Sequence, residues 1–311
     1  MDISVIVCTY NRSQQLKQCL GSLEKQIVPE GLSWEVLVVD NNSTDDIKKF
    51  IEEFKKSTIL NIRYEFEEKL GVSFARNTGC REANGNIILF IDSDAVADSN
   101  WLKNIIKPIN EYDADCVGGK ILPQVWPTKK PKWLTKELYS YIGIYNKGEE
   151  AVELDFYIDV PFSGNMAFKK TTFNEIGQFN VSLGRVGTKS TFGGEEQDWE
   201  RKLLDKGRKI FYQPDAIVYH PLRPEMLTKK YLRTMDFHTG EKNALLFFGE
   251  YNKRNIFGIP LFIFNQFFRS VIRYIVYIIK HGYNNSFRQE LYCWYFLGFM
   301  FGRVKYWSGH K

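Results

Sequence analysis

The first 91 residues alternate short apolar runs with segments of helical periodicity, and this alternation constrains the fold more than any other feature. Strands are predicted at residues 3–8, 35–39, 61–66 and 86–91, and helices at residues 13–26, 45–56 and 72–83. Ser43 and Thr44 are candidate N-caps of the second helix, and Asn84-Gly85 ends the third. Because parallel strands need a crossover between them, the alternation predicts an α/β fold with a doubly wound, mostly parallel sheet.

The pattern becomes less regular after residue 120. Residues 121–160 are rich in Pro, Lys and Trp, and they are predicted to form a long irregular excursion over the sheet, of the kind that often carries function. Regular pattern resumes at residues 162–168, followed by a helix at 195–206 and strands at 209–212 and 216–219. We therefore expect one α/β body over residues 1–222 and a separate helical region over residues 223–311.

Two acids, Asp92 and Asp94, follow the predicted strand at 86–91. Ligands of open α/β sheets bind just outside the carboxyl ends of the strands, and acids two residues apart project on the same side of an extended chain. In proteins Mg²⁺ is usually held by one or two carboxylates together with substrate phosphates. The pair predicts a metal–diphosphate site, although a solvated acidic turn explains the local sequence equally well.

Other polar residues fall on the same edge of the predicted sheet. Thr9-Tyr10-Asn11 follows the first strand, Asp40 ends the second, and Arg76 lies near the start of a helix. Asp40 can accept a hydrogen bond from a base or a ribose, but aspartate is also common in turns. The guanidinium fork of Arg76 suits a diphosphate, or it is simply solvated. The chain has no G-x-x-x-x-G-K-[ST] and no G-x-G-x-x-G after its first strand, which argues against a P-loop and a dinucleotide-binding domain.

Three acids, Glu195, Glu196 and Asp198, lie in the first turn of the predicted helix at 195–206. Acids complement the helix dipole at that position, so the cluster has an ordinary structural explanation. The functional alternative is a general base beside a sugar hydroxyl. His220 closes the last strand, where it is either a structural histidine or an imidazole that completes the site begun by two carboxylates.

Charge divides the chain unevenly. Residues 1–222 carry 28 Lys and Arg against 32 Asp and Glu, whereas residues 223–311 carry 14 against 5. Charge-free runs at 255–268 and 291–302 are shorter than the ~20 apolar residues of a membrane span, and they indicate interfacial or buried segments. On a helical wheel Arg269, Arg273 and Lys280 fall within about 40° of one another, beside an aromatic and aliphatic face. This pattern predicts a helix lying in a membrane surface, with a helix packed on the catalytic body as the alternative.

Six short segments occur in a recognisable order, at residues 9–12, 38–45, 71–79, 92–94, 164–168 and 194–198. In this order they resemble the motifs of family 2 inverting glycosyltransferases with the GT-A fold, over roughly residues 1–222. The resemblance implies an enzyme that uses Mg²⁺ or Mn²⁺ and moves a sugar from a nucleotide sugar, expected to be a UDP-sugar. The acceptor would be a hydroxyl of a glycan or a lipid-linked molecule, in bacterial surface polysaccharide synthesis.

The resemblance also assigns roles to individual residues. Glu196 matches the family's base, one methylene longer than the usual Asp, and Glu195 is the alternative. Within the donor site, Asp40 would contact the base and Arg76 would lie near the diphosphate. The metal ligands would be Asp94, Asp92 and His220. The expected nucleotide-sugar site comprises Thr9, Tyr10, Asn11, Arg12, Asp40, Asn42, Arg76, Asp92 and Ser93. The expected acceptor site comprises Gly164, Asn165, Asp198 and Trp199.

The residues themselves are also compatible with two other classes of protein. A nucleotidyltransferase that makes nucleotide sugars shares the sheet and the metal, but it would carry a Gly-rich loop with Arg and Lys where residues 9–12 stand. A noncatalytic assembly protein would use the basic C-terminal region to bind partners or nucleic acid. The N-terminus lacks the pattern of a signal peptide, and the five cysteines show no metal-binding spacing. We therefore expect a cytoplasmic protein, peripheral on the inner face of the cell membrane, that does not bind nucleic acid.

Overall fold

The computed structural model describes residues 1–155, 160–186, 193–246 and 254–308. The chain forms two compact units. The first contains Met1–Val125 and Gly143–Pro221, and the second contains Trp126–Ile142 and Leu222–Lys311. The second unit thus includes a segment that the sequence analysis placed in the catalytic body, because Trp126–Ile142 packs with the C-terminal helices.

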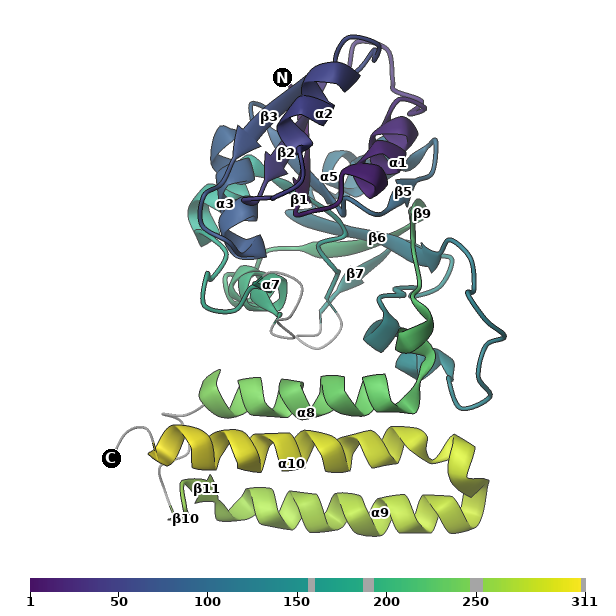
Figure 1. Cartoon of the computed structure of the whole chain (residues 1–311), viewed down its shortest axis with the longest axis vertical. Coiled ribbons are helices and arrows are strands. Elements are labelled where there is room, and N and C mark those ends of the chain that lie inside the picture. Colours follow the sequence, from purple (N-terminus) through teal and green to yellow (C-terminus); the bar gives the residue numbers. More distant parts are fainter. Residues whose placement is uncertain (156–159, 187–192, 247–253, 309–311) are drawn as a thin grey trace. The chain divides into compact units, whose positions relative to one another are not determined.

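The first unit is built on a mixed sheet of nine strands within the described residues (Figure 1). Four of its strands run parallel, as the sequence predicts, and their order is β3-β2-β1-β4. They are β1 (Ile3–Thr9), β2 (Trp34–Asp40), β3 (Ile62–Phe66) and β4 (Ile87–Ile91). The sheet continues through β8 (Asn165–Lys169), β6 (Cys116–Pro123), β9 (Ile210–His220) and β5 (Val96–Ala97). Strand β8 is antiparallel to both β4 and β6, and β7 (Val152–Leu154) pairs with β9.

Helices cover both faces of this sheet. One hydrophobic core contains the inward side chains of α1 (Ser13–Leu23), α2 (Ile47–Phe54), α4 (Trp101–Ile105) and α5 (Lys107–Tyr112). The other contains those of α3 (Val72–Glu82), α6 (Lys170–Ile176) and α7 (Glu195–Asp205). Successive strand residues alternate between the two cores, so that Val5 and Val7 belong to one and Ile6 to the other. The doubly wound α/β fold is therefore confirmed.

The predicted caps of the second helix are wrong. Helix α2 begins only at Ile47, and its N-cap residue makes no side-chain hydrogen bond. Ser43 accepts a hydrogen bond at Oγ from the backbone N–H of Asn11 (3.0 Å), and the N–H of Thr44 donates to Asn11 Oδ1 (2.7 Å). These two residues therefore brace the loop after β1 against the loop after β2, which is a tertiary contact that local pattern does not reveal.

The stretch at 121–160 is more regular than the sequence indicates. Its start belongs to β6, Lys136–Ile142 forms the 3₁₀ helix η1, and Val152–Leu154 forms β7, while residues 156–159 lie outside the described ones. Strand β6 escapes detection because it contains Gly118 and Gly119, which are poor strand formers. A Cβ on Gly119 would lie 2.3 Å from the carbonyl oxygen of Ala216, so the close approach of β9 requires glycine. The two strands predicted at 209–219 are one strand, β9, whose register shifts beside Gly119 and Lys120.

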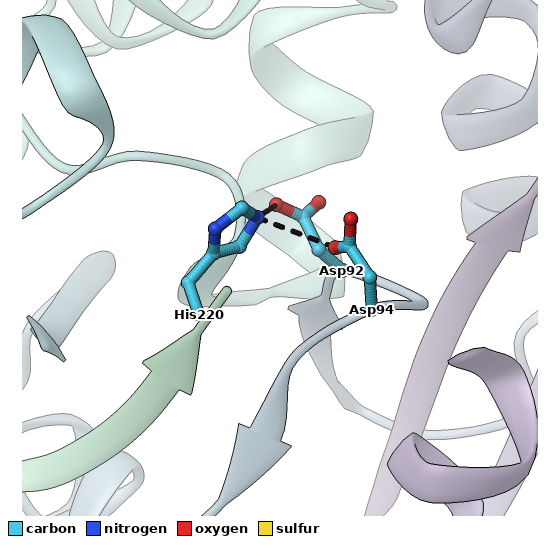
Figure 2. A group of neighbouring side chains, drawn as sticks. All are labelled: Asp92, Asp94 and His220. Atoms are coloured by element: carbon cyan, nitrogen blue, oxygen red, sulfur yellow. Dashed lines mark ion pairs between the residues drawn. The ribbon is translucent and has the colours of Figure 1, made fainter. Parts of the chain in front are cut away.

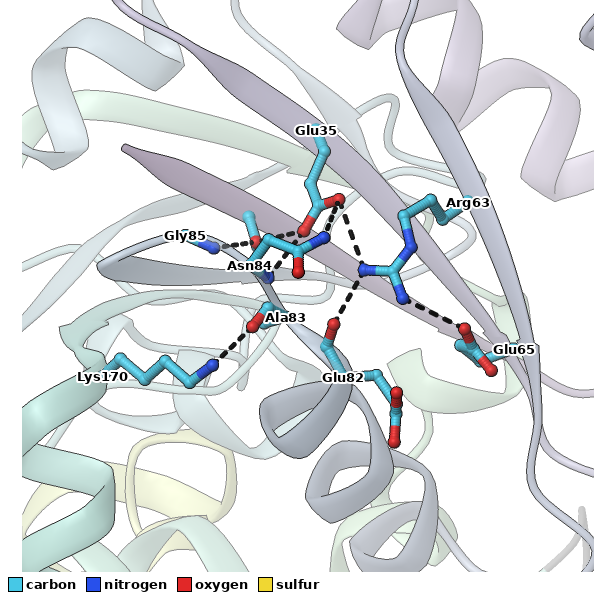
Figure 3. Close-up of polar contacts among 9 residues, drawn as sticks. Glu35, Arg63, Glu65, Glu82, Ala83, Asn84, Gly85 and Lys170 are labelled. Carbon is cyan, nitrogen blue, oxygen red and sulfur yellow. Dashed lines mark hydrogen bonds and ion pairs between the residues drawn. The ribbon is translucent and has the colours of Figure 1, made fainter. Parts of the chain in front are cut away.

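A buried polar network fixes the amino end of the sheet (Figure 3). Glu35 accepts hydrogen bonds from Ser4 Oγ (2.6 Å) and from the backbone N–H of Asn84 (2.8 Å), and it pairs with Arg63 (3.4 Å). Burial alone would raise the pKa of Glu35, but these contacts lower it, so the carboxylate stays ionised. The N–H of Gly85 donates to Ser4 Oγ (2.8 Å). The network joins the amino ends of β1, β2 and β3 to the turn before β4, and so it helps to hold these strands in register.

The second unit is helical. It contains α8 (Lys229–Leu246), α9 (Leu261–Asn285) and α10 (Phe287–Ser308), together with η1, η2 (Pro224–Leu227) and the short pair β10 (Asn255–Ile256) and β11 (Ile259–Pro260). Helix α10 packs against both α8 and α9 (Figure 1). The α8–α10 contact is close because it is made at glycines: a Cβ on Gly240 would lie 2.0 Å from the carbonyl oxygen of Tyr295.

Helix α9 corrects one expectation. The apolar runs were predicted to be too short for a membrane span, but α9 has 25 residues and is long and apolar enough to cross a membrane by length and composition. Only 6% of its most apolar window is buried inside the structure. The charge-free run ends just before Arg269, so the sequence analysis took the segment as short. The helix continues past Arg269 to a kink at Gly282. Whether such a helix spans a membrane or lies flat on it depends on the positions of its charged residues.

Candidate active site

The carboxyl ends of several strands meet at one edge of the sheet. Thr9 and Asp40 are paired in the parallel register of β1 and β2, and Asp92 directly follows β4. His220 is the last residue of β9. It lies near the acids because its neighbour Tyr219 pairs with Val96 of β5, which follows the Asp92–Asp94 turn. The structure thus gathers at one edge residues that the chain separates by more than 200 positions.

Asp92, Asp94 and His220 form a compact group (Figure 2). The Nε2 atom of His220 lies 3.2 Å from Asp94 Oδ1 and 3.7 Å from Asp92 Oδ2. Ligand atoms of the three residues all lie within 4.8 Å of one another. A Cβ at Gly164 would come within 2.6 Å of Asp92 Oδ2, so glycine at this position leaves room for the carboxylate. Two carboxylates and an imidazole are a donor set that suits Mg²⁺ or Mn²⁺.

The protonation of His220 depends on what occupies this group. Its Nδ1 lies 3.1 Å from the carbonyl oxygen of Pro221, so Nδ1–H donates there and Nε2 points at the acids. Burial would lower the pKa of His220, but the hydrogen bond to Asp94 and the charges of both aspartates raise it. Without a cation the imidazole is therefore favoured as the charged partner of the acids. When a cation is bound, a neutral His220 in the same orientation would offer the lone pair of Nε2 as a ligand.

Arg12 also reaches this group. Its Nη1 lies 2.5 Å from Asp94 Oδ2, although the Arg12 side chain is 45% exposed. Burial would raise the pKa of Asp94, but the contacts with His220 and Arg12 lower it. Asp94 is therefore an ionised carboxylate with positive charge on two sides, and a divalent cation would take the place of that charge.

Asp40 lies in a second polar group on the same edge, with Thr9 as its register partner. It is buried, and it accepts hydrogen bonds from the N–H of Ser43 (3.0 Å) and the hydroxyl of Tyr64 (3.0 Å). Thr9 Oγ1 is buried with no hydrogen-bond partner in the described structure. Asn11 and Asn42 both adopt positive φ, at 53° and 60°, so the loops after β1 and β2 turn sharply beside Asp40. A rigid acceptor next to an unsatisfied hydroxyl is suited to binding a polar ligand.

The acids of α7 are held by Arg76 of α3. The Arg76 guanidinium is buried, forms an ion pair with Glu195, and lies 3.9 Å from Glu196 Oε2. Burial would raise the pKa of Glu195, but Arg76 lowers it. The pKa of Glu196 is raised to about 7 by burial and by the charge of Glu195, against the opposing effect of Arg76. Two neighbouring carboxyls thus have pKa values driven apart, which is the arrangement expected of an acid–base site.

Glu200 is a buried acid near the Arg76–Glu195–Glu196 group that the sequence analysis did not consider. It lies one helical turn after Glu196, its side chain is completely buried, and neither of its oxygens has a hydrogen-bond partner among the described residues. Burial and the charge of Glu196 raise its pKa well above the usual range, so Glu200 is held as a neutral acid. The i, i+4 spacing from Glu196 was the available signal, but helix periodicity alone does not show that this face is buried.

Two of the predicted acceptor residues are structural. Trp199 is completely buried among aromatic rings of the core and donates to the carbonyl oxygen of Gly177 (2.8 Å). Asn165 is also buried; its amide donates to two backbone carbonyls and its oxygen accepts from Trp101 Nε1 (2.7 Å). Both side chains are buried and hydrogen-bonded within the core, which argues against a contact of either with an acceptor. Asp198 remains partly exposed, in an ion pair with Lys202 (2.6 Å).

The doubly wound sheet, with an antiparallel strand beside β4, matches the GT-A fold of solved glycosyltransferase structures. The family model for glycosyl transferase family 2 matches residues 4–177, and the chain belongs to this family. Membership identifies it as an enzyme of the transferase class.

Relatives and solved structures agree with this assignment. A glucosyl-dolichyl phosphate glucuronosyltransferase of Haloferax volcanii is 25% identical over 225 residues, covering 71% of this chain and 70% of the relative. The structure of the mannosyltransferase PcManGT of Pyrobaculum calidifontis with GDP-Man and Mn²⁺ matches with a TM-score of 0.57 and 19% identity, over 78% of this chain and 64% of that one. TarS 1–349 of Staphylococcus aureus with UDP matches with a TM-score of 0.53 and 21% identity, over 99% and 92%. At these identities the solved structures support the fold alone.

Proposed function

We propose that this enzyme is a divalent-cation-dependent, inverting glycosyltransferase that moves a sugar from a UDP-sugar to a hydroxyl group. The observation that carries the proposal is the Asp92–Asp94–His220 group at the same sheet edge as the Arg76–Glu195–Glu196 group. The two groups are electrostatically linked, because the charge of Asp92 acts on Arg76. Asp92, Asp94 and His220 would hold Mg²⁺ or Mn²⁺, which supplies positive charge to a leaving diphosphate.

Glu196 is the proposed general base. A pKa of about 7 means that a large fraction is ionised at neutral pH while the carboxylate is still basic enough to take a proton. As the acceptor oxygen attacks the anomeric carbon, its proton passes to Glu196, and the bond from that carbon to the diphosphate oxygen breaks. Glu195 is the weaker candidate, because its ion pair with Arg76 lowers its pKa. Arg76 orients both acids, and its guanidinium is also proposed to lie near the diphosphate.

The donor proposal rests on Asp40 and its polar neighbours. The buried Asp40 carboxylate is an acceptor that suits the N–H of a nucleobase. The neighbouring Thr9 hydroxyl, which has no hydrogen-bond partner in the described structure, would bind another polar atom of the nucleoside. Tyr10, Asn11, Arg12, Asn42 and Ser93 complete the proposed nucleotide-sugar site. UDP is favoured because it is the nucleotide of the matching TarS structure, although PcManGT binds GDP-Man.

The acceptor is proposed to be a glycan or a lipid-linked molecule used in making a surface polysaccharide. The relative from H. volcanii is named for a lipid-linked acceptor, a glucosyl-dolichyl phosphate. Helix α9 adds support, because it exposes a long apolar surface within a strongly basic region. We propose that the enzyme is peripheral on the inner face of the cell membrane, with Gly164 and Asp198 on the acceptor side of the site.

A panel of nucleotide sugars tests the proposal. Purified enzyme is incubated with UDP-, GDP- and dTDP-sugars, with Mn²⁺ or with EDTA, and release of the nucleoside diphosphate is measured. We expect slow hydrolysis of one or a few UDP-sugars that stops in EDTA. Release of pyrophosphate from a sugar phosphate and UTP would identify a nucleotidyltransferase instead. No turnover and no nucleotide binding would favour an assembly protein.

A further inference from the structure

The outer surface of α9 carries an apolar stripe. At ~100° per residue, five side chains fall within about 60° of one another on this helix. They are Leu261, Phe268, Ile272, Ile275 and Ile279, of which between 45% and 78% is exposed in each case. A different sector of the helix contacts α10: Ile263 is buried, and the hydroxyl of Tyr274 donates to Glu290 (3.0 Å). The stripe is therefore not part of the core of the helical unit.

A row of basic residues flanks the stripe. Arg269, Arg273 and Lys280 are exposed and lie within about 40° of one another, on the side of the helix away from the α10 contact. Helix α9 contains no acidic residue. Its surface thus has three sectors, which are a face against α10, an exposed apolar stripe, and a cationic row beside the stripe.

We propose that α9 lies flat in the interface of an anionic membrane and does not span the bilayer. The stripe enters the boundary of the acyl chains, and the basic row binds lipid phosphates at the level of the headgroups. This inference rests on the membrane association proposed above, to which it adds the binding surface, the lipid class and the orientation of the helix.

The contacts of α9 argue against a span. Arg273 lies in the middle of the helix, so a spanning α9 would place it at the bilayer centre. Tyr274 is bonded to Glu290 of α10, and Glu290 pairs with Arg233 of α8 (2.5 Å). A spanning α9 would draw this charged group into the hydrocarbon or would have to break it. A flat helix keeps Glu290 on the protein side and Arg273 beside the phosphates.

The charges of α9 also argue against pairing with a second copy of the chain. The stripe repeats at intervals of four and three residues from Phe268 to Ile279, which would suit a helix pair. In a pair of two such helices, parallel or antiparallel, no cation of one α9 would meet an acid of the other, because α9 contains none. Anionic lipid supplies the opposite charge, so the membrane is the favoured occupant.

Depth measurements test the orientation directly. Single cysteines replace Phe268, Ile272, Ile275 and Ile279 in turn in the full-length chain, and each carries an environment-sensitive fluorophore, with labelled parent protein as the blank. Vesicles of phosphatidylglycerol and phosphatidylcholine contain lipids brominated at a shallow or a deep position. A flat α9 predicts similar quenching at all four sites, stronger from the shallow bromine. Deep quenching that peaks at Ile272 and falls toward Ile279 would show a span and overturn the proposal.

Affinity measurements identify the occupant. We expect Ile272→Ser combined with Ile275→Ser, and separately Arg269→Gln combined with Arg273→Gln, to weaken vesicle binding by tenfold or more. The matched apolar control is Ile59→Ser in the first unit, where an 86% exposed isoleucine should not affect binding. Equal binding by all variants, or a stripe-dependent dimer that does not bind vesicles, would contradict the proposal. Transfer to a water-soluble acceptor is assayed alongside, so failure of membrane binding is distinguished from failure of the proposed activity.

Discussion

Arg76 of α3 forms a buried ion pair with Glu195, the first residue of α7, across 119 positions of sequence. The pair ties together two helices that cover the same face of the sheet. It also separates the pKa values of the two adjacent carboxyls. Glu195 stays ionised, whereas the pKa of Glu196 is about 7. Several expected outcomes depend on this division of charge.

Glu196→Gln should abolish most transfer while leaving UDP binding intact. The amide has nearly the same shape but cannot take the acceptor proton, and loss of a general base typically costs ~10²–10⁴-fold in rate. The measurements are kcat with the best donor and calorimetric binding of UDP with Mn²⁺. Glu53→Gln, at an exposed position on α2, is the matched control. Near-normal turnover in the Glu196 variant would remove this residue as the base.

The rate should depend on pH through Glu196. Because the base must be ionised, kcat/KM should rise as the pH increases and level off above about 7. The charge of Glu195 helps to raise the pKa of Glu196, so Glu195→Gln should move the acid limb to lower pH. If the rise of kcat/KM occurs at the same pH in this variant as in the wild type, another group controls the pH dependence.

Arg76→Met should destabilise the fold. It leaves Glu195 buried without its partner, a change that typically costs about 3–5 kcal/mol. The pKa of Glu195 would then rise above its unfolded value, so the loss should be largest at neutral pH and should shrink as the pH falls toward that value. Urea unfolding at pH 7 and pH 5 measures the difference. An equal loss at both values would mean that packing, not charge, is responsible.

Glu200→Gln should stabilise the enzyme increasingly as the pH rises. The folded-state pKa of Glu200 lies well above its unfolded value, so the wild-type residue lowers stability progressively from about pH 4.5 upward, by up to ~1.4 kcal/mol per unit. Glutamine does not titrate, so the two proteins should differ least at pH 4.5 and most at pH 8. Thermal unfolding over this range measures the trend, and a constant difference would contradict a neutral Glu200.

Asp94→Asn should weaken Mn²⁺-dependent nucleotide binding. It removes one negative charge from the Asp92–Asp94–His220 group while keeping the shape of the side chain. Titration of UDP with and without Mn²⁺ measures the effect, which should be a loss of tenfold or more in the presence of metal only. Asp113→Asn is a control, since that exposed acid pairs with Lys169. Unchanged affinity in both conditions would count against a metal at Asp94.

The sequence by itself determined the α/β framework and most of the strand-end residues. Apolar strands separated by amphipathic helices leave few other arrangements, and parallel strands necessarily bring Thr9, Asp40 and Asp92 to one edge. Local pattern failed at β6, where glycines conceal a strand, and at Ser43 and Thr44, whose partner is Asn11. It also failed to separate the buried Trp199 from an accessible ligand-binding residue.

Only the tertiary structure distinguishes the acids of α7 from one another. In the sequence, Glu195 and Glu196 are two acids that suit a helix N-terminus, and Glu200 is unremarked. Their different pKa values come from burial and from the distance of each carboxyl to Arg76, a residue that the chain places on another helix. Likewise, His220 joins Asp94 only because β9 pairs with β5. Residue type and order specify the framework, whereas proximity and solvent exclusion, which exist only in the folded chain, specify the chemistry.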